Sequence, residues 1–295
     1  MTERSVPLSG VTLNVAECIN DPARSRENPT LLMLHGVSRR WQTYVPLFPA
    51  FSFRWNVMAV DFRGHGKSTA VPGRYHVINY VDDIVELVKQ ELHSGRLNGP
   101  IAIYGHSLGA MVAAGAASRL GTDVSAVVLE DPPLHTMGEK IHRNILLSLF
   151  RGMQQFAGDA RSVREIATDL SNVLLHDPEN GKKIRLGTVR DTTTLRFSAA
   201  ALKLVDRDVF SPIVSGEWLK GYDVETVFSN LHCPALLLQA DSAAGGMLTD
   251  EDASLVSRLA ADLSLVRFQG TGHMIHSTRT TDLVNMVHSF LESVR

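Results

Sequence analysis

A five-residue turn, Gly-His-Ser-Leu-Gly at 105–109, constrains the fold of this chain more than any other feature. Apolar residues run into the turn, and small or apolar residues follow it without a polar break, as expected where a buried strand passes directly into a buried helix. G-x-S-x-G in that setting describes a nucleophile elbow, whose sharp turn holds the serine in a strained conformation. We therefore predict that Ser107 projects above the carboxyl edge of a sheet. Gly105 and Gly109 are expected because side chains there would collide with the neighbouring strand and helix.

The turn belongs to a longer alternation of strand-like and helix-like stretches. Continuous apolar runs bounded by turn residues are typical of strands buried on both faces, and apolar residues at helical spacing indicate amphipathic helices. The stretches expected to contain strands are 10–17, 29–36, 54–68, 100–107, 124–133, 233–242 and 264–273, and those expected to form helices are 79–92, 109–120, 250–262 and 280–294. This order predicts an α/β fold with a mostly parallel central sheet and helices on both faces.

The stretch 134–231 interrupts the alternation. It contains helix-like pieces and no convincing buried strand, so we expect a helical cap (lid) inserted between two strands of the sheet. The predicted core domain then consists of 1–133 and 232–295, which is consistent with one large α/β domain in a chain of 295 residues.

Charge and composition exclude several classes of protein. The formal net charge is −2 and the pI about 6.6, which gives no basic footprint for nucleic acid. No apolar run reaches about 18 residues, and the first residues lack the apolar core of a signal peptide. Two cysteines, Cys18 and Cys233, indicate no disulfide framework. We expect a cytoplasmic protein with a small-molecule substrate and no nucleic-acid or membrane partner, and the sequence leaves monomer or homodimer open.

Four motifs in order give the chain a resemblance to a known family. They are LHGV at 34–37, DFRGHGKS at 61–68, GHSLG at 105–109 and GTGH at 270–273. Together they resemble the α/β-hydrolase fold family across nearly the whole chain, and they imply a serine hydrolase of the esterase or lactonase kind with a helical lid. DFRGHGKS itself is interpreted as a tight turn in which Asp61 and Arg63 fix neighbouring loops.

The resemblance implies the base and the oxyanion donors that a serine nucleophile needs. His273, directly after the last strand, is preferred as the base, and His276 is the competing choice. The expected oxyanion donors are the backbone N–H groups of Leu108 and Val37. The residues expected around the substrate are His35, Gly36, Leu134, Met137 and Trp218, with His35 more often a structural residue of its loop. No metal or cofactor is expected.

The acid that orients the histidine is the ambiguous member. The commonest family position, after the strand that follows the lid, holds alanine here, and Asp241 comes too early. Some members carry the acid at the end of the strand before the lid, where this chain has Glu130 and then Asp131. We therefore prefer Glu130 and keep Asp241 as the alternative. Asp131 is expected to cap the lid segment or to hold the turn at 132–133.

These residues predict acyl transfer to water through an acyl-enzyme intermediate. The expected substrate is an ester or lactone of a small, largely apolar or aromatic compound, because the lid offers many apolar residues. The same residues also permit a C–C bond hydrolase, a perhydrolase or a non-catalytic small-molecule receptor, because the fold alone does not select the chemistry.

Overall fold

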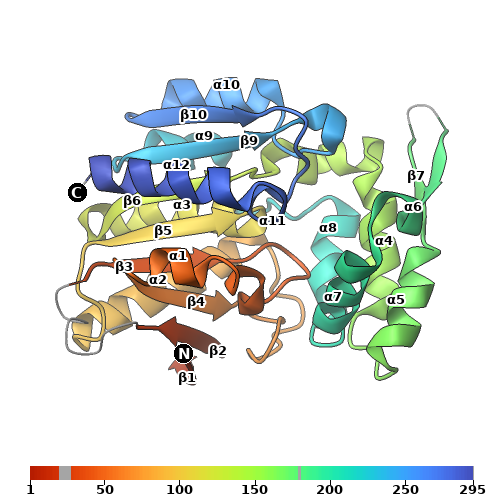
Figure 1. Ribbon diagram of the computed structural model, residues 1–295, viewed down its shortest axis with the longest axis horizontal. Helices are drawn as coiled ribbons and strands as arrows, with labels where there is room; N and C mark the ends of the chain where they lie inside the picture. Colours follow the sequence, from red (N-terminus) through yellow and green to blue (C-terminus); the bar gives the residue numbers. More distant parts are fainter. Residues whose placement is uncertain (20–27, 179–180, 295) are drawn as a thin grey trace.

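The fold is built on one eight-stranded sheet, which the computed structural model shows within the described residues 1–19, 28–178 and 181–294 (Figure 1). The strand order is β1-β2-β4-β3-β5-β6-β9-β10. Strand β2 runs antiparallel to both of its neighbours, and the remaining pairs are parallel. The strands are β1 (Thr2–Leu8), β2 (Val11–Cys18), β3 (Thr30–Leu34), β4 (Asn56–Asp61), β5 (Ile101–His106), β6 (Val124–Glu130), β9 (Ala235–Ala240) and β10 (Leu263–Phe268). The predicted α/β class with a mostly parallel sheet is confirmed.

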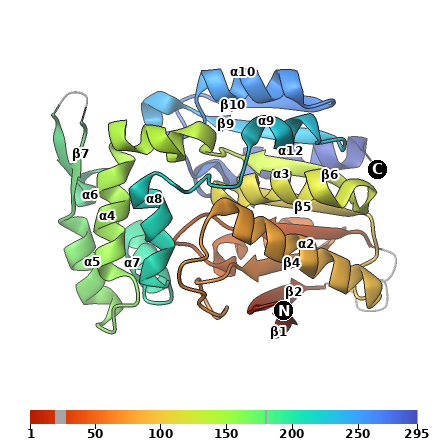
Figure 2. The ribbon, with the colours of Figure 1, turned by 180° about the vertical axis from the view of Figure 1, so that it is seen from behind.

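Helices cover both faces of the sheet, which is why the central strands are largely apolar (Figures 1 and 2). One face carries α1 (Phe48–Phe51), α11 (Ile275–Thr278) and α12 (Thr280–Ser293), and the other carries α2 (Val77–His93), α3 (Leu108–Leu120), α9 (Val224–Ser229) and α10 (Asp250–Leu259). Side chains alternate between these faces, so Leu31 and Met33 of β3 pack under α12 whereas Leu32 and Leu34 pack under α2 and α3. All residues of β3 are buried.

The first strand, β1, was not expected from the sequence. It pairs along its whole length with β2, the strand expected at 10–17. Only Val6 of β1 is buried. An edge strand with polar residues on both faces lacks the apolar run by which the other strands are identified.

The segment between β6 and β9 forms a separate group of helices beyond the carboxyl ends of the strands (Figure 1). The group contains α4 (Leu146–Phe156), α5 (Val163–Ser171), α6 (Leu186–Val189), α7 (Thr192–Leu202) and α8 (Ser211–Ser215). It also includes a small antiparallel pair, β7 (Leu174–His176) and β8 (Lys183–Arg185), that the sequence did not predict. Helix α9 lies against α3 on the sheet, outside this group (Figure 2).

Two further sequence expectations concern membranes and disulfides. Within the described residues, no helix has both the length and the apolar character needed to cross a bilayer. Cys18 and Cys233 are both free thiols.

Candidate active site

Ser107 lies in the predicted elbow, at the junction of β5 and α3. Its backbone has φ 57° and ψ −118°, a conformation that a non-glycine residue rarely adopts. A Cβ on Gly109 would lie 1.8 Å from the carbonyl oxygen of Leu34, and a Cβ on Gly105 would lie 2.1 Å from that of Gly109. The prediction that both positions require glycine is therefore confirmed. The serine itself is 4% exposed, so little water reaches it.

The loop after β3 lies directly against this elbow. A Cβ on Gly36 would come within 3.2 Å of the Cβ of Ser107. The N–H of Val37 belongs to this loop, and the N–H of Leu108 begins α3. Within the described part of the chain, neither N–H donates a hydrogen bond to a protein acceptor. Both groups are free to bind an oxyanion, and that role stays a prediction.

His35 holds the loop in shape through both of its ring nitrogens. Nδ1 lies 2.8 Å from the Gly36 carbonyl oxygen, and Nε2 accepts the N–H of Phe62 at 3.1 Å. Burial lowers the pKa of His35 to about 4, so the ring is neutral at pH 7. His65, which the sequence did not single out, acts in the same way, since its Nε2 accepts the N–H of Ser38 at 3.2 Å. Burial lowers the pKa of His65 to about 3.

Asp61 and Arg63 fix neighbouring loops, as predicted for the DFRGHGKS turn. The Asp61 carboxylate accepts the backbone N–H groups of Trp41 at 2.8 Å and of Lys67 at 3.0 Å. The Arg63 guanidinium donates to both carboxylate oxygens of Asp83. These bonds hold the loop that begins after β3 and the start of α2 against the end of β4.

His273 lies on the loop after β10, next to the elbow. Its ring centroid is 4.6 Å from that of His106, and its carbonyl oxygen lies 3.0 Å from His106 Nε2. Among the described residues, no hydrogen bond joins the Ser107 hydroxyl to the His273 ring. Such a bond is often long before substrate binds. The position of His273 is consistent with its predicted role as the base.

Asp131 is the carboxylate that contacts His273. Its Oδ2 lies 2.6 Å from His273 Nδ1, and the Asp131 side chain is fully buried. The same carboxylate accepts the backbone N–H groups of Ala240 at 3.1 Å, Met247 at 2.8 Å and Leu248 at 3.2 Å. These three N–H donors and His273 together fix the orientation of the Asp131 carboxylate. The expectation that Asp131 caps the lid segment or holds the turn at 132–133 is wrong, because its carboxylate contacts His273 instead.

Glu130 contacts the other histidine, so the prediction that it orients His273 is contradicted. Its oxygens lie 3.0 and 2.9 Å from His276 Nδ1, and Oε1 also accepts the His276 backbone N–H at 2.9 Å. The Tyr104 hydroxyl donates to Oε2. Burial raises the pKa of Glu130, but nearby His276 and these hydrogen bonds outweigh burial and hold the pKa at about 2.

The end of β6 explains this exchange of partners. Val128 belongs to the core on the face of α12 and Leu129 to the core on the face of α3, and Glu130, the last residue of the strand, continues the alternation and joins Tyr104 on the first face. Asp131 follows the strand with φ 46°, outside the extended conformation, and its side chain contacts His273 instead. Neighbours in sequence therefore serve different histidines.

Asp241, the alternative acid, is also not in contact with His273. Its Oδ2 accepts the N–H of Gly270 at 2.8 Å and its Oδ1 accepts that of Ala243 at 2.9 Å. The hydrogen bond from Gly270 and the one from Ala243 lower the pKa of this carboxyl. Asp241 holds the loop that leads to His273. Across the described ranges, no hydrogen bond connects it to the His273 ring.

One cluster has the composition of a metal site. His106, Glu130 and His276 each place a possible ligand atom within 4.8 Å of the others, and all three side chains are buried. A divalent cation would suit such ligands. However, the Glu130 oxygens already accept hydrogen bonds from Tyr104 and His276, and a cation would have to displace these bonds. Glu130 and His276, together with Tyr104, are therefore best described as a hydrogen-bonded support behind the elbow.

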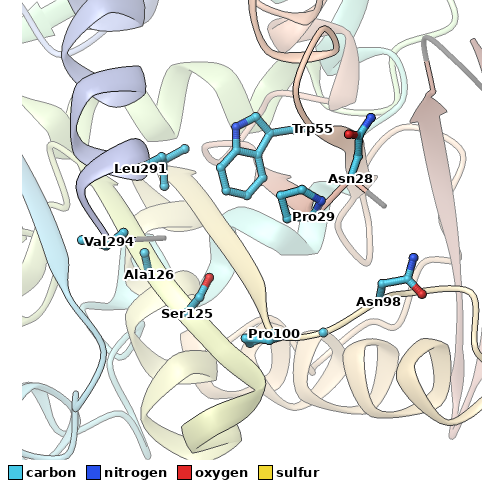
Figure 3. Close-up of a pocket in the computed structure, with 10 residues that line it drawn as sticks. Asn28, Pro29, Trp55, Asn98, Pro100, Ser125, Ala126, Leu291 and Val294 are labelled. Carbon is cyan, nitrogen blue, oxygen red and sulfur yellow. The ribbon is translucent and has the colours of Figure 1, made fainter. Parts of the chain in front are cut away.

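The residues expected around the substrate are all buried. Leu134, Met137 and Trp218 are at most 1% exposed and belong to the core cluster under α3. Their contact with substrate stays a prediction. A surface pocket of about 470 Å³ lies at the opposite, amino-terminal edge of the sheet, where Figure 3 shows Pro29 and Pro100 beside the starts of β3 and β5. That pocket is remote from the elbow and does not belong to this site.

The elbow, the loop after β3 and the Asp131–His273 pair together form the arrangement expected of the α/β-hydrolase fold, and comparison with known proteins gives the same family. The model of the alpha/beta hydrolase family matches residues 31–285, so this chain belongs to that family. It is 24% identical over 294 residues to 2-(acetamidomethylene)succinate hydrolase of Mesorhizobium japonicum, covering 98% of this chain and 95% of the relative.

Two solved structures have the same fold. One is the N-formylmaleamic acid deformylase of Pseudomonas putida, with a TM-score of 0.74, 19% identity, and coverage of 97% of this chain and 100% of that one. The other is the enol-lactonase of Burkholderia xenovorans, with a TM-score of 0.71, 17% identity, and coverage of 98% and 100%.

Proposed function

We propose that this protein is a serine hydrolase that cleaves an ester or lactone bond of a small substrate through an acyl-enzyme intermediate. The observation that carries the proposal is the Asp131–His273 hydrogen bond of 2.6 Å beside the strained Ser107 elbow. A carboxylate on Nδ1 places the proton there and leaves Nε2 as the basic nitrogen that a serine hydroxyl requires.

In the first step, Ser107 attacks the substrate carbonyl carbon while His273 Nε2 takes the hydroxyl proton. The N–H groups of Val37 and Leu108 donate to the oxyanion, and each such donor contributes roughly 3–4 kcal/mol to the transition state. The imidazolium is stabilised by Asp131 and then protonates the leaving alcohol. In the second step, His273 removes a proton from water, which attacks the acyl carbon, and His273 then returns that proton to Ser107 Oγ as the acid is released.

Amide hydrolysis is the second candidate. The names of the Mesorhizobium relative and of a second one from Acinetobacter baylyi, 32% identical over 89 residues, specify substrates with an acetamido or N-methylformamido group. The same steps serve an amide, because His273 protonates the leaving nitrogen in place of an alcohol. The C–C bond hydrolase expected as an alternative would use the same serine and histidine on a diketone.

Labelling with a fluorophosphonate, followed by mass spectrometry, tests the proposal. We expect modification of Ser107 in the wild type and its loss in Ser107→Ala and His273→Ala. The exposed His93 provides a matched control, so His93→Gln should be labelled at the wild-type rate. A folded wild-type protein that resists labelling would refute the proposal. A panel of p-nitrophenyl esters, lactones, anilides and a ring-cleavage diketone then separates the candidate bonds.

A further inference from the structure

A buried arginine, Arg39, lies within the segments that surround Ser107. It follows the loop of Gly36 and Val37, and its backbone N–H donates to the Gly36 carbonyl oxygen at 3.1 Å. Its guanidinium donates to the Sδ of Met274, the residue after His273, at 3.4 Å. The guanidinium therefore bridges the loop of the predicted oxyanion donors and the loop of the predicted base.

The same guanidinium also reaches helix α7 of the insertion. One Nη donates to the Ser198 hydroxyl at 2.9 Å, and the guanidinium carbon lies 5.8 Å from the centre of the Phe197 ring. Arg39 therefore lies between helix α7 of the insertion and the loops next to Ser107. The residue is 9% exposed, so only a small part of its surface reaches solvent.

No carboxylate of the described residues neutralises this charge. Throughout residues 1–19, 28–178 and 181–294, Arg39 has no ion pair with an aspartate or glutamate. By contrast, the buried Arg63 has a bidentate partner in Asp83. Burial lowers the pKa of Arg39 to about 10, and the positive charge of Arg190 acts in the same direction. At pH 7 the guanidinium is nevertheless charged.

Burial of an unpaired charge is costly, so proteins retain one where an opposite charge arrives from elsewhere. A guanidinium is planar and matches a carboxylate through two parallel hydrogen bonds. The Ser198 and Met274 contacts each use a single donor of Arg39, which leaves further N–H donors for a ligand.

We propose that Arg39 binds a carboxylate group of the substrate, so that the natural substrate is an acyl compound that carries a free carboxylate near the scissile bond. This inference rests on the proposed acyl transfer by Ser107. It replaces the expected largely apolar or aromatic substrate with one that carries a negative charge, and it makes Arg39 a determinant of specificity. Ser198 holds the guanidinium in place from the insertion.

The test compares two esters that differ only in this group: phenyl hydrogen succinate, with a free carboxylate, and methyl phenyl succinate, in which it is masked. We expect wild-type kcat/KM to favour the acid by about 10- to 100-fold, the range for a hydrogen bond to a charged group. Arg39→Met should abolish this preference, and Arg39→Lys should retain part of it. Arg119→Met, which removes an exposed charge paired with Asp82, should leave the preference unchanged.

Two additional measurements separate the possible failures. Fluorophosphonate labelling of Ser107 needs no carboxylate, so the wild-type protein should be labelled whether or not Arg39 binds one. Loss of wild-type labelling would refute the proposed function, whereas normal labelling without a preference for the acid would refute only the role of Arg39. The Tm of Arg39→Met should be equal to or higher than that of the wild type, because an unpaired buried charge is removed. A large fall in Tm with an unchanged preference would make Arg39 a structural anchor of the insertion.

Discussion

Replacing Asp131 by asparagine changes one oxygen of a carboxylate that has four hydrogen-bond donors around it. Oδ1 accepts the backbone N–H groups of Ala240 and Leu248, and Oδ2 accepts that of Met247 and faces His273. An amide NH2 in the place of Oδ1 would oppose two N–H donors. An NH2 in the place of Oδ2 opposes one N–H and donates to His273 Nδ1. The second arrangement is the less costly, so the asparagine should present its NH2 to the histidine.

The consequence is the wrong tautomer of His273. With Nδ1 as acceptor, the proton moves to Nε2, which can no longer accept the proton of Ser107. In serine proteases with a Ser-His-Asp triad, replacing the triad aspartate by asparagine lowers kcat about 10⁴-fold although the geometry of the site stays intact. We expect a fall of about 10³- to 10⁴-fold in kcat for Asp131→Asn on any ester that the wild type cleaves. The enzyme concentration must be set by active-site titration, which excludes unfolded protein from the comparison.

Glu130→Gln is the matched control, because it neutralises the adjacent carboxylate. Glu130 bonds His276, and among the described residues no hydrogen bond joins it to the His273 ring. We therefore expect kcat per titrated site to fall by less than about tenfold, far less than in Asp131→Asn, where His273 takes the wrong tautomer. The unfolding free energy should nevertheless drop by about 3–5 kcal/mol, since one partner of a buried pair is lost. If Glu130→Gln lost as much kcat as Asp131→Asn, or if Asp131→Asn retained near-normal kcat, the assignment of the acid would be refuted.

Three further predictions concern stability. His35 and His65 have pKa values lowered to about 4 and 3, so the unfolded chain binds more protons below pH 6.5, and these two side chains should remove about 4 kcal/mol of unfolding free energy between pH 7 and 5. Burial also lowers the pKa of His106 and adds to the loss in the same direction, so a flat urea-unfolding profile would contradict the prediction. Gly109→Ala should prevent formation of soluble folded protein, as followed by circular dichroism, because its Cβ would overlap a carbonyl oxygen at 1.8 Å. Asp83→Asn should lower the unfolding free energy, measured by chemical denaturation, by about 3–5 kcal/mol, because it leaves the buried Arg63 without its anion. A decrease below about 1 kcal/mol would mean that the Arg63–Asp83 pair is effectively solvated.

The parts of the fold and site that depend on local pattern could be predicted from the sequence. The elbow at Ser107 was identifiable because two glycines, an apolar strand and an apolar helix all occur within a few residues. The central strands were identifiable because burial on both faces demands continuous apolar runs. Strand β1 lacks such a run and was missed, and so were the short strands β7 and β8 in the insertion, which are mostly exposed.

The acid could not be predicted because the choice depends on which face of the sheet each residue meets. Glu130 and Asp131 are adjacent and chemically alike, so composition does not separate them. One signal was available: if Val128 and Leu129 are assigned to opposite cores, the alternation places Glu130 on the face of Val128. Asp131 leaves the strand with φ 46°, a conformation that the alternation does not predict. Deciding which direction leads to His273 still requires the packing of the loop after β10, which is a long-range contact.

The adjacent carboxylates also explain how nucleophile and base are held in one frame. The backbone carbonyl of Glu130 accepts the N–H of Ser107 at 2.9 Å, and the side chain of Glu130 accepts the N–H of His276 at 2.9 Å. The end of β6 is thus bonded to the elbow on one side and to the segment that carries His273 on the other. Asp131 directly follows Glu130 and its carboxylate contacts the His273 ring. A displacement of the end of β6 would therefore move Ser107 and His273 together. The proposed catalytic geometry therefore depends on one strand terminus more than on the insertion above it.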